Sequence, residues 1–248
     1  MSMIGKVVLV AGGGRDIGKA CALEFAKQGA NVVITYLASG TSAEQTSAEI
    51  ESCGVKALAI QADLSQAEQV NKVVNQTIDE FGQIDHLVHV AGGLLERVKV
   101  SDMSSEHWHK VMDVNMTSLF LMCKACIPHF SKGSTIVTFA SQAGCDGGGP
   151  GAVAYATSKG AIMAFNRGLA KEIGPDIRVN SVCPGMINTG FHDTFTADNV
   201  RTNVASATCA KREGNSEEVA NLVYFLASEK ASYMTGNNVD INGGLVFS

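Results

Sequence analysis

The sequence predicts one α/β domain, built as a doubly wound parallel sheet with helices on both faces. Three observations support this prediction. Short apolar runs alternate with longer amphipathic runs along all 248 residues, glycine or proline ends most of the amphipathic runs, and neither a linker nor an internal repeat interrupts them. Strands that alternate with helices lie parallel and are joined by right-handed crossovers. We therefore expect a single domain over residues 1–248.

The individual elements follow from these runs in chain order. Strands are predicted at Lys6–Ala11, Asn31–Tyr36, Val55–Gln61, Asp85–Val90, Ser134–Ala140, Asp176–Val182 and Asn238–Ile241. Helices are predicted at Asp16–Gln28, Ser42–Ser52, Gln66–Phe81, Glu106–Ile127, Val153–Ile173 and Ser216–Ala227, the last with Ser216 as its N-cap. The stretch Thr189–Glu213 has no clean helical period, so we expect it to form a lid or loop.

Composition excludes several classes of function. Hydrophobic residues make up 46% and charged residues 17%, which is typical of a folded globular chain. A net charge of −5 without a basic block argues against nucleic acid as the partner. No apolar run reaches the length of a membrane span, and Met1–Lys6 is no signal peptide. We therefore expect a cytoplasmic protein that is not bound to a membrane.

Cysteine and histidine give no sign of a metal site. The seven cysteines are scattered and odd in number, as expected of reduced thiols in the cytoplasm. Cys123 and Cys126 form a C-x-x-C pair inside an apolar helical run, so we interpret them as helix packing. The six histidines lack ligand spacing, and no metal is expected.

The turn after the first strand is rich in glycine and reads Ala11-Gly12-Gly13-Gly14-Arg15-Asp16-Ile17-Gly18. Glycines let backbone N–H groups approach a pyrophosphate, and the N-terminus of the following helix adds a partial positive charge. An ordinary glycine-rich turn is the alternative, but the position at the first crossover favours a phosphate site. The candidate cofactor contacts here are Gly12, Gly14, Arg15, Asp16, Ile17 and Gly18.

The end of the second strand bears on the choice between NADP and NAD. A carboxylate there would bind the adenosine ribose hydroxyls of NAD. This strand instead ends Thr35-Tyr36-Leu37, and Arg15 is placed to meet a 2′-phosphate. The alternative for Arg15 is a solvated loop charge. The sequence thus favours NADP, keeps NAD as the alternative, and adds Tyr36 to the candidate contacts.

Three further strand ends carry residues suited to a cofactor. After the third strand comes Asp63-Leu64, whose carboxylate either accepts from an adenine amino group or caps the next helix, a role for which Ser65 competes. After the fourth comes Ala91-Gly92-Gly93, where small residues leave room for a flat ring or a ribose. After the sixth come Pro184, Gly185, Ile187 and Thr189, in a segment whose backbone groups can hold a carboxamide.

Tyr155 and Lys159 lie four residues apart in a predicted helix, so their side chains share one face. A free tyrosine has a pKa near ~10, and a cation one turn away lowers it. Such a pair is a general acid and base for a C–OH/C=O couple, with a chance pairing on a helix surface as the alternative. Ser141, after the fifth strand, either hydrogen-bonds a substrate oxygen or is a plain turn serine.

Together these motifs resemble the short-chain dehydrogenase/reductase family over nearly the whole chain, most closely its 3-oxoacyl-[acyl-carrier-protein] reductase-like branch. The matching residues are the glycine turn, Asp63-Leu64, Ala91-Gly92, Asn115, Ser141, Tyr155 with Lys159, the run Arg178–Gly185, and the C-terminal runs Tyr233–Gly236 and Asp240–Gly244. The resemblance implies a Rossmann fold with a seven-stranded parallel sheet. It also implies a homotetramer formed through the helices Glu106–Ile127 and Val153–Ile173.

The resemblance implies a role for each of four catalytic residues. Tyr155 is expected to donate the proton during carbonyl reduction, and Lys159 to lower the pKa of Tyr155 and to bind the nicotinamide ribose. Ser141 is expected to position the substrate oxygen. Asn115 is expected to interrupt its helix and to hold a water that links Lys159 to solvent. The hydride comes from the nicotinamide cofactor.

The chain departs from the family pattern at three places. Asp16 stands where the glycine turn usually has a small residue. Its carboxylate must turn away from a pyrophosphate, cap the helix or meet a cation, and Arg15 or a neighbouring loop is the expected partner. His89-Val90 replaces the usual Asn-Asn, and Ala11 replaces the usual Thr. We hypothesise that these last two changes compensate each other, which requires Ala11 to lie near Val90.

The substrate is a small carbonyl or alcohol whose class the sequence leaves open. The lid holds Phe191, His192, Phe195 and Arg201, while Arg97 and Lys99 are suited to attract an anionic group. A 3-oxoacyl thioester, a keto-sugar and a keto-acid all remain candidates. The intact catalytic set argues against a silent nucleotide-binding module, and a nucleotide-sugar epimerase or dehydratase is not expected because that branch adds a C-terminal substrate domain.

Overall fold

The predicted strands pair in parallel in one seven-stranded sheet within residues 3–247, which the computed structural model describes. They are β1 (Val7–Ala11), β2 (Asn31–Tyr36), β3 (Ala57–Gln61), β4 (His86–His89), β5 (Thr135–Phe139), β6 (Arg178–Pro184) and β7 (Asn238–Ile241). Their order in the sheet is β3-β2-β1-β4-β5-β6-β7, which confirms the doubly wound Rossmann fold. The order reverses between β1 and β4, and ligands bind outside the carboxyl ends of the strands at such a point.

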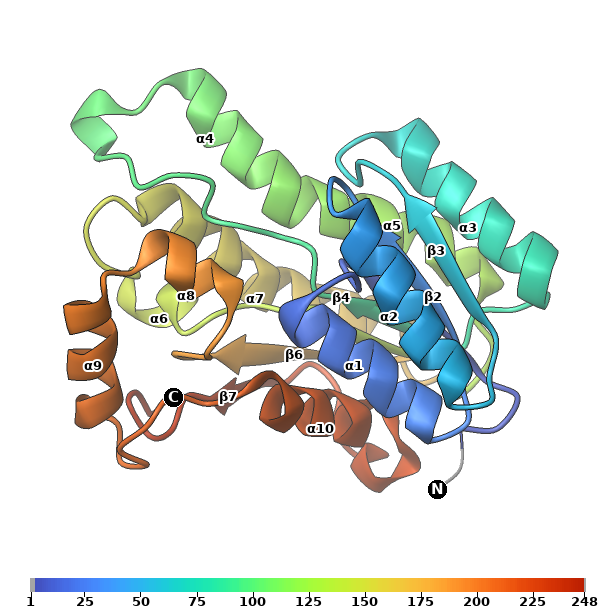
Figure 1. Ribbon diagram of the computed structural model, residues 1–248. Coiled ribbons are helices and arrows are strands. Elements are labelled where there is room, and N and C mark those ends of the chain that lie inside the picture. Colours follow the sequence, from blue (N-terminus) through green and yellow to red (C-terminus); the bar gives the residue numbers. More distant parts are fainter. Residues whose placement is uncertain (1–2, 248) are drawn as a thin grey trace.

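Two layers of helices cover the sheet (Figure 1). One layer contains α1 (Asp16–Lys27), α2 (Gly40–Ser52) and α10 (Ser216–Ala227), and the other contains α3 (Ala67–Phe81), α4 (Ser105–Met112), α5 (Ser118–Cys126) and α7 (Val153–Ile173). A short helix that the sequence did not predict, α6 (Ala143–Asp146), follows β5. Short 3₁₀ turns lie at Val100–Asp102, Ile127–His129 and Glu229–Ala231.

Strands β1 to β6 contribute to two apolar cores, one on either side of the sheet, whereas β7 contributes to one. Leu9 of β1 and Leu87 of β4 lie in the core beneath α3, α5 and α7, whereas Val10 and Val88 lie in the core beneath α1 and α10. Successive strand residues point to opposite faces, so a strand that is covered on both sides needs apolar residues throughout. This is why the strands appear in the sequence as continuous apolar runs.

The long predicted helix over 106–127 is interrupted. The α-helical part ends at Met112, the residues Asp113–Thr117 form a π-helical turn, and α5 begins at Ser118. The interruption that the resemblance implied at Asn115 is therefore present. Single π turns within α-helices are often found at functional sites.

The N-cap of α10 is Asn215 and not the predicted Ser216. The Asn215 side chain accepts from the backbone N–H of Glu218 at 2.8 Å, and the Glu218 carboxylate accepts from the backbone N–H of Asn215 at 2.9 Å. This reciprocal pair is a capping box. The prediction was one residue out because Asn and Ser are about equally good caps.

The predicted lid at 189–213 contains two helices, α8 (Gly190–Phe195) and α9 (Asp198–Ala207). Figure 1 shows both at one end of the molecule, beyond the carboxyl end of β6. No residue of α9 is buried. The helix therefore adds no side chain to the apolar core, and Val200 on it is 45% exposed.

One stretch corrects the expectation that no run is long enough to span a membrane. Among the described residues, Ser105–His129, which includes α4, the π turn and α5, is long and apolar enough by length and composition. In the fold, Leu119, Met122 and Cys123 of this stretch are buried in the core beside the sheet. A core helix of a soluble protein passes the same test, and these contacts are those of a core helix.

Candidate active site

The predicted site residues lie in a row along the carboxyl edge of the sheet. The glycine turn follows β1, and the row continues with Tyr36 at the end of β2, Asp63 after β3, Gly92 after β4, Ser141 after β5 and Pro184 at the end of β6. Neighbouring strands lie about 4.8 Å apart, so six strands span roughly 24 Å. A row of this length suits an extended ligand such as a dinucleotide.

The glycine turn has no room for side chains at Gly12, Gly13 and Gly18, where a Cβ on Gly13 would come 2.5 Å from Cγ2 of Ile34. A Cβ on Gly18 would come 2.0 Å from the carbonyl oxygen of Gly12, and a Cβ on Gly12 (φ +84°) would come 2.9 Å from the backbone N of Ala91. Thr35 of β2 holds the turn, because its Oγ1 accepts from the N–H of Gly12 at 3.1 Å and its carbonyl accepts from that of Gly13 at 3.0 Å. The turn therefore presents backbone to a ligand. The role of Thr35 was not predicted, because it depends on the pairing of β2 with β1 and not on a local pattern.

Arg15 and Asp16 follow these glycines. The Arg15 side chain is 66% exposed, and its Nη1 lies 3.8 Å from Oδ2 of Asp16. Asp16 has φ +49°, a left-handed conformation that glycine adopts without strain. Its Oδ1 accepts a hydrogen bond from the N–H of Gly190, the first residue of α8, at 3.3 Å. The carboxylate thus meets both partners that the sequence suggested, Arg15 and a neighbouring loop.

Asp63 closes a turn ahead of α3. Its Oδ1 accepts from the backbone N–H of Ser65 at 3.0 Å and from the hydroxyl of Ser65 at 2.7 Å. The N-cap position of α3 is Gln66, so neither Asp63 nor Ser65 takes the capping role. Leu64 is buried and Tyr36 is half-buried beside them. Contact between Asp63 and adenine stays a prediction.

Asn115, Gly92 and Lys159 meet beyond the end of β4. Asn115 accepts from the N–H of Gly93 at 3.0 Å and donates to the carbonyls of Gly93 at 2.8 Å and Val111 at 2.9 Å. A Cβ on Gly92 would come 2.6 Å from Oδ1 of Asn115 and 3.3 Å from Nζ of Lys159. The site therefore requires glycine at position 92. Protein backbone engages both ends of the Asn115 amide, and its contact with a water stays a prediction.

The Lys159 ammonium is buried beside the Tyr155 ring. It donates to the carbonyl of Phe139, at the end of β5, at 2.7 Å. The same nitrogen lies 5.7 Å from the centroid of the Tyr155 ring. Burial lowers the pKa of Lys159 to about 8. The hydrogen bond from Lys159 to the Phe139 carbonyl was not predicted, because the register of the sheet, and not a local sequence pattern, brings these two groups together.

Burial raises the pKa of Tyr155, and a smaller effect of the neighbouring Ser141 side chain lowers it, so the net direction is upward. The prediction that the Tyr155 pKa is lowered is therefore wrong for this structure. Lys159 directs its hydrogen bond to Phe139 and faces the ring, and no lowering by its charge offsets the burial.

His89 is buried close to this group. Burial and, after it, the positive charge of Lys159 lower the pKa of His89 to about 3, so the ring is neutral. Its Nε2 has no hydrogen-bond partner among the residues that the structure describes. Ala11 lies opposite His89 in the sheet, and the N–H of Val90 donates to the carbonyl of Ala11 at 2.9 Å. The proximity that the compensation hypothesis requires is present.

The segment after β6 is held by its neighbours on both sides. Gly185 donates to the carbonyl of Ile241 at 3.0 Å, and the carbonyl of Pro184 accepts from the N–H of Gln142 at 3.0 Å. Ile187 and Thr189 are buried, and the Thr189 hydroxyl donates to the carbonyl of Ile187 at 3.2 Å. The segment therefore lies directly beside the turn that carries Ser141.

The lid covers Tyr155 with an aromatic side chain. The ring centroid of Phe191 lies 5.9 Å from that of Tyr155, and Phe195 lies 5.1 Å from Phe191. His192 meets the Phe191 ring edge-on at 5.1 Å, and burial lowers the pKa of His192. The lid surface next to Tyr155 is thus aromatic.

Arg201 of α9 ties the lid to its own base. Its Nε and Nη2 each donate to the Glu213 carboxylate at 2.8 Å, and Nη2 also donates to Oδ1 of Asn188 at 2.9 Å. Nη1 pairs with Asp193 of α8. One guanidinium therefore joins both lid helices to the two ends of the lid segment.

Arg97 holds the far end of α8. Its Nε donates to the carbonyl of Phe195 at 3.1 Å, and its Nη1 donates to the carbonyls of Pro150 at 3.1 Å and Gly148 at 3.3 Å. The sequence suggested Arg97 as an attractor for an anionic substrate. In the structure its guanidinium instead joins the end of α8 to the loop that contains Gly148 and Pro150.

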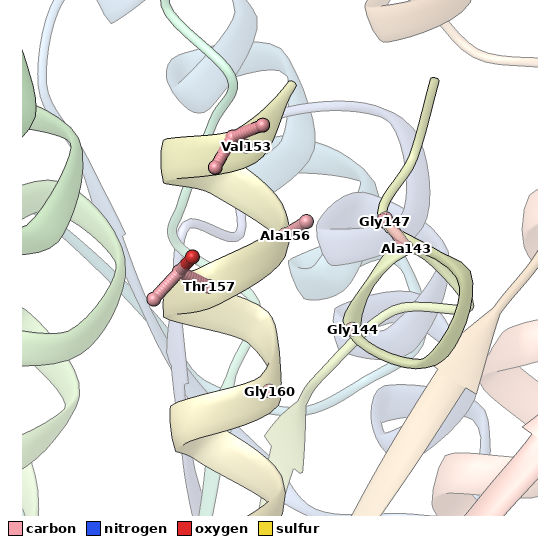
Figure 2. A pocket seen from close by; sticks show the side chains of 7 residues that line it. All are labelled: Ala143, Gly144, Gly147, Val153, Ala156, Thr157 and Gly160. Carbon is pink, nitrogen blue, oxygen red and sulfur yellow. The ribbon is translucent and has the colours of Figure 1, made fainter. Parts of the chain in front are cut away.

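A shallow groove between α6 and α7 lies apart from this site (Figure 2). It has a volume of about 270 Å³ and is lined by Ala143, Gly144, Gly147, Val153, Ala156, Thr157 and Gly160. Its lining positions on α7 lie about a third of a turn away from Tyr155 and Lys159. Because its lining includes no ionisable side chain, it offers no acid or base.

Metal and disulfide chemistry have no visible basis in the described residues. Among residues 3–247, no group of three or more His, Cys, Asp or Glu side chains is placed to hold a metal ion. All seven cysteines are free. Burial raises the pKa of Cys123 to about 12 and that of Cys126 in the same direction, which is the behaviour of packed, protonated thiols.

Proteins of similar sequence carry the names of oxidoreductases. A family model described as enoyl-(acyl carrier protein) reductase matches residues 11–246. An uncharacterized oxidoreductase of Bacillus subtilis, YhdF, is 36% identical over 98% of this chain and 84% of its own length. A 3-oxoacyl-[acyl-carrier-protein] reductase of Synechocystis sp. is 36% identical over 99% of this chain and 98% of its own length.

Solved structures extend the similarity to the whole fold. A short-chain dehydrogenase/reductase from Serratia marcescens superposes with a TM-score of 0.93 at 32% identity and covers 99% of both chains. A short chain dehydrogenase from Burkholderia cenocepacia, solved in complex with NADP, superposes with a TM-score of 0.92 at 32% identity over 99% of both chains.

Proposed function

This chain belongs to the short-chain dehydrogenase/reductase family, and we propose that it reduces a carbonyl to an alcohol with NADPH. One arrangement carries the proposal: the Ser141 side chain is close enough to Tyr155 to lower its pKa, and the Lys159 ammonium lies 5.7 Å from the centroid of the Tyr155 ring. A proton donor, a polar group that can orient an oxygen, and a buried cation thus meet at the carboxyl edge of the sheet. This is the edge at which folds of this type bind dinucleotides.

The chain's own residues handle the proton. Tyr155 stays protonated at neutral pH because burial raises its pKa, and its hydroxyl donates to the carbonyl oxygen as general acid. The Ser141 hydroxyl orients that oxygen. The Lys159 ammonium, 5.7 Å from the centroid of the Tyr155 ring, would hold the nicotinamide ribose, while Asn115 fixes the loop at Gly93. When bound, the nicotinamide supplies the hydride.

The residues present fit a dinucleotide phosphate. The turn from Gly12 to Gly18 is closely packed at three glycines, and its lack of side chains there leaves backbone N–H groups to meet a pyrophosphate. We propose NADP because the exposed Arg15 guanidinium suits a 2′-phosphate and no carboxylate ends β2. Tyr36, Asp63, Leu64, the Ala91–Gly93 turn and the segment from Pro184 to Thr189 complete the proposed cofactor site.

The cofactor proposal is tested by replacing Arg15. Arg15→Ala should weaken NADPH binding about tenfold, the value of one charge-assisted contact, and leave NADH nearly unchanged. Dissociation constants from fluorescence titration measure this. Lys19→Ala is the matched control, because Lys19 one turn along α1 already pairs with Glu49 at 2.7 Å. Equal weakening of both cofactors by Arg15→Ala would refute the phosphate contact.

The lid supports an apolar substituent beside the carbonyl. Phe191 and Phe195 would strip water from the hydroxyls of a keto-sugar without replacing the lost hydrogen bonds, which is costly. A keto-acid would need a cation, and the guanidiniums of Arg97 and Arg201 are both bonded to protein. A 3-oxoacyl thioester, which places an alkyl chain beside its ketone, therefore fits the site better than either.

We also propose a cytoplasmic homotetramer that acts on a small molecule. The proposed contact helices carry exposed apolar side chains, with Phe120 of α5 45% exposed and Val153 of α7 43% exposed. A second copy of the chain would cover them. Light scattering should then give a mass four times that of the 26.0 kDa chain, and a monomeric mass would contradict the assembly.

The function is tested by following NADPH oxidation with a panel of carbonyls. An acetoacetyl thioester should react faster than fructose or pyruvate. Faster oxidation with a crotonyl thioester would replace carbonyl reduction with reduction of a C=C bond, the reaction in the family model's description. NADPH binding without oxidation by any compound would support a catalytically silent nucleotide-binding protein instead.

A further inference from the structure

We propose that Asp16 is a positioning residue that anchors the lid to the cofactor turn, and that it is not a cofactor ligand. The proposal deepens the function proposed above and rests on its cofactor site. Asp16 lies in the turn where the pyrophosphate would bind, yet its Oδ1 accepts from the N–H of Gly190 at 3.3 Å. Gly190 is the first residue of α8 and stands 174 positions away in the chain.

Gly190 is seated between two side chains of the turn. A Cβ added to Gly190 would come 3.3 Å from Nη1 of Arg15 and 3.5 Å from Oδ2 of Asp16. The lid therefore begins in direct contact with the turn, on the side chains of both residues. The next residue, Phe191, packs on the Tyr155 ring. A shift of Gly190 would move the aromatic cover of the proton donor.

A carboxylate at position 16 has two local disadvantages. Its backbone adopts φ +49°, a left-handed conformation that glycine adopts more readily than Asp or Asn. Its charge also repels an anionic group bound at the same turn. A residue that breaks two local rules is expected to bring a compensating gain elsewhere. The contact with Gly190 is the gain that the structure displays.

The other polar anchors of the lid do not relate it to the cofactor turn. Arg201 joins lid segments to one another through Glu213 and Asn188. Arg97 holds the opposite end of α8 through the carbonyl of Phe195. Asp16 thus links the first residue of α8 to the turn after β1. This link fixes the position of the lid relative to the turn that would hold a dinucleotide.

The first test uses hydrogen–deuterium exchange without cofactor or substrate. Asp16→Gly removes the carboxylate and suits the left-handed backbone, whereas Asp16→Asn keeps an oxygen acceptor and tolerates that backbone. Amides of 189–195 should exchange roughly tenfold faster in Asp16→Gly, the effect of about one lost charge-assisted hydrogen bond. Asp16→Asn should exchange more slowly than Asp16→Gly. Unchanged exchange in the lid of Asp16→Gly, or an equal increase in α10, would overturn the proposal.

The second test measures the dissociation constant of NADPH by fluorescence titration. Asp16→Gly should bind NADPH at least as tightly as the unmodified protein, because a repelling charge is removed. Binding weakened about tenfold or more would make Asp16 a cofactor ligand and overturn the proposal. Neither test needs turnover, so a loosened lid in a protein that reduces no carbonyl would count against the proposed reaction alone.

Discussion

Helix α7 and the lid meet where the rings of Tyr155 and Phe191 pack, yet different interactions hold the two regions. Lys159 on α7 is buried, and its ammonium is bonded to the backbone of β5. The lid helix α9 buries no residue. The lid depends on side chains, above all the guanidiniums of Arg97 and Arg201.

This difference in how α7 and the lid are held predicts different roles for them, with α7 acting in the reaction and the lid in closing the site. Segments with few buried apolar contacts open locally at low cost, whereas buried core elements open only with the whole domain. We therefore expect changes on α7 to lower kcat, because they alter groups that act in the transition state. Changes in the lid should raise KM for the carbonyl, because they alter how the site closes.

The largest expected effect comes from removing the phenolic hydroxyl. Tyr155→Phe keeps the ring and its packing on Phe191 but cannot donate a proton. We expect kcat to fall by about 10²–10⁴-fold, with the NADPH dissociation constant nearly unchanged. NADPH oxidation and fluorescence titration measure the two quantities. Turnover at the original rate in this variant would remove Tyr155 from the mechanism.

The pH dependence tests whether the buried ammonium acts with Tyr155. Burial lowers the pKa of Lys159 to about 8, so the rate of carbonyl reduction should fall above that pH, by up to about tenfold per unit. Lys159→Arg keeps its charge to higher pH and should move the fall upward. A profile that is the same in both proteins would assign the fall to another group.

The same shift has a consequence for stability that needs no substrate. The pKa of Lys159 is about 8 in the folded protein and near ~10.4 in an unfolded chain. Between these pH values the unfolded chain binds more protons, so the contribution of Lys159 to the free energy of unfolding rises with pH. Denaturant titrations at pH 8 and pH 10 should show this rise in the native protein, and Lys159→Met should remove it.

The sequence predicted the residues of the glycine turn and of α7 better than the structure of the lid. The spacing of Tyr155 and Lys159, and the glycines of the first turn, are local signals that survive without knowledge of the fold. The carbonyl of Phe139 and the hydroxyl of Thr35 act through strand register, which a single segment does not encode. The pKa direction of Tyr155 depends on burial, which is a property of the whole fold.

The lid was harder to predict because long-range polar contacts stabilise it. α9 buries no residue, and Arg201 on α9 is bonded to residues on either side of both lid helices. The link from Asp16 to Gly190 joins the first turn of the chain to its last quarter. No local pattern predicts such contacts, since charged side chains in a loop are usually solvated.

A middle-sized effect is expected when the lid loses its central guanidinium. Arg201→Gln should raise KM for the carbonyl about tenfold while kcat changes less than about twofold. Lys56→Gln is the matched control, because Lys56 pairs with Glu80 of α3 at 3.0 Å and lies outside the lid. An equal rise in KM in both variants would show that general surface charge, and not closure of the lid, is responsible.

The smallest expected effect lies at the contact between the two regions. Phe191→Leu keeps an apolar side chain but removes the aromatic contact with Tyr155, which lies 5.9 Å away between ring centroids. Such ring pairs contribute about 0.5–1.5 kcal/mol, so kcat/KM for an acetoacetyl thioester should fall roughly two- to tenfold. The loss should appear in KM if the ring only closes the site. A loss confined to kcat would mean that Phe191 also orients the Tyr155 phenol, and the lid would then take part in proton transfer as well as in closing the site.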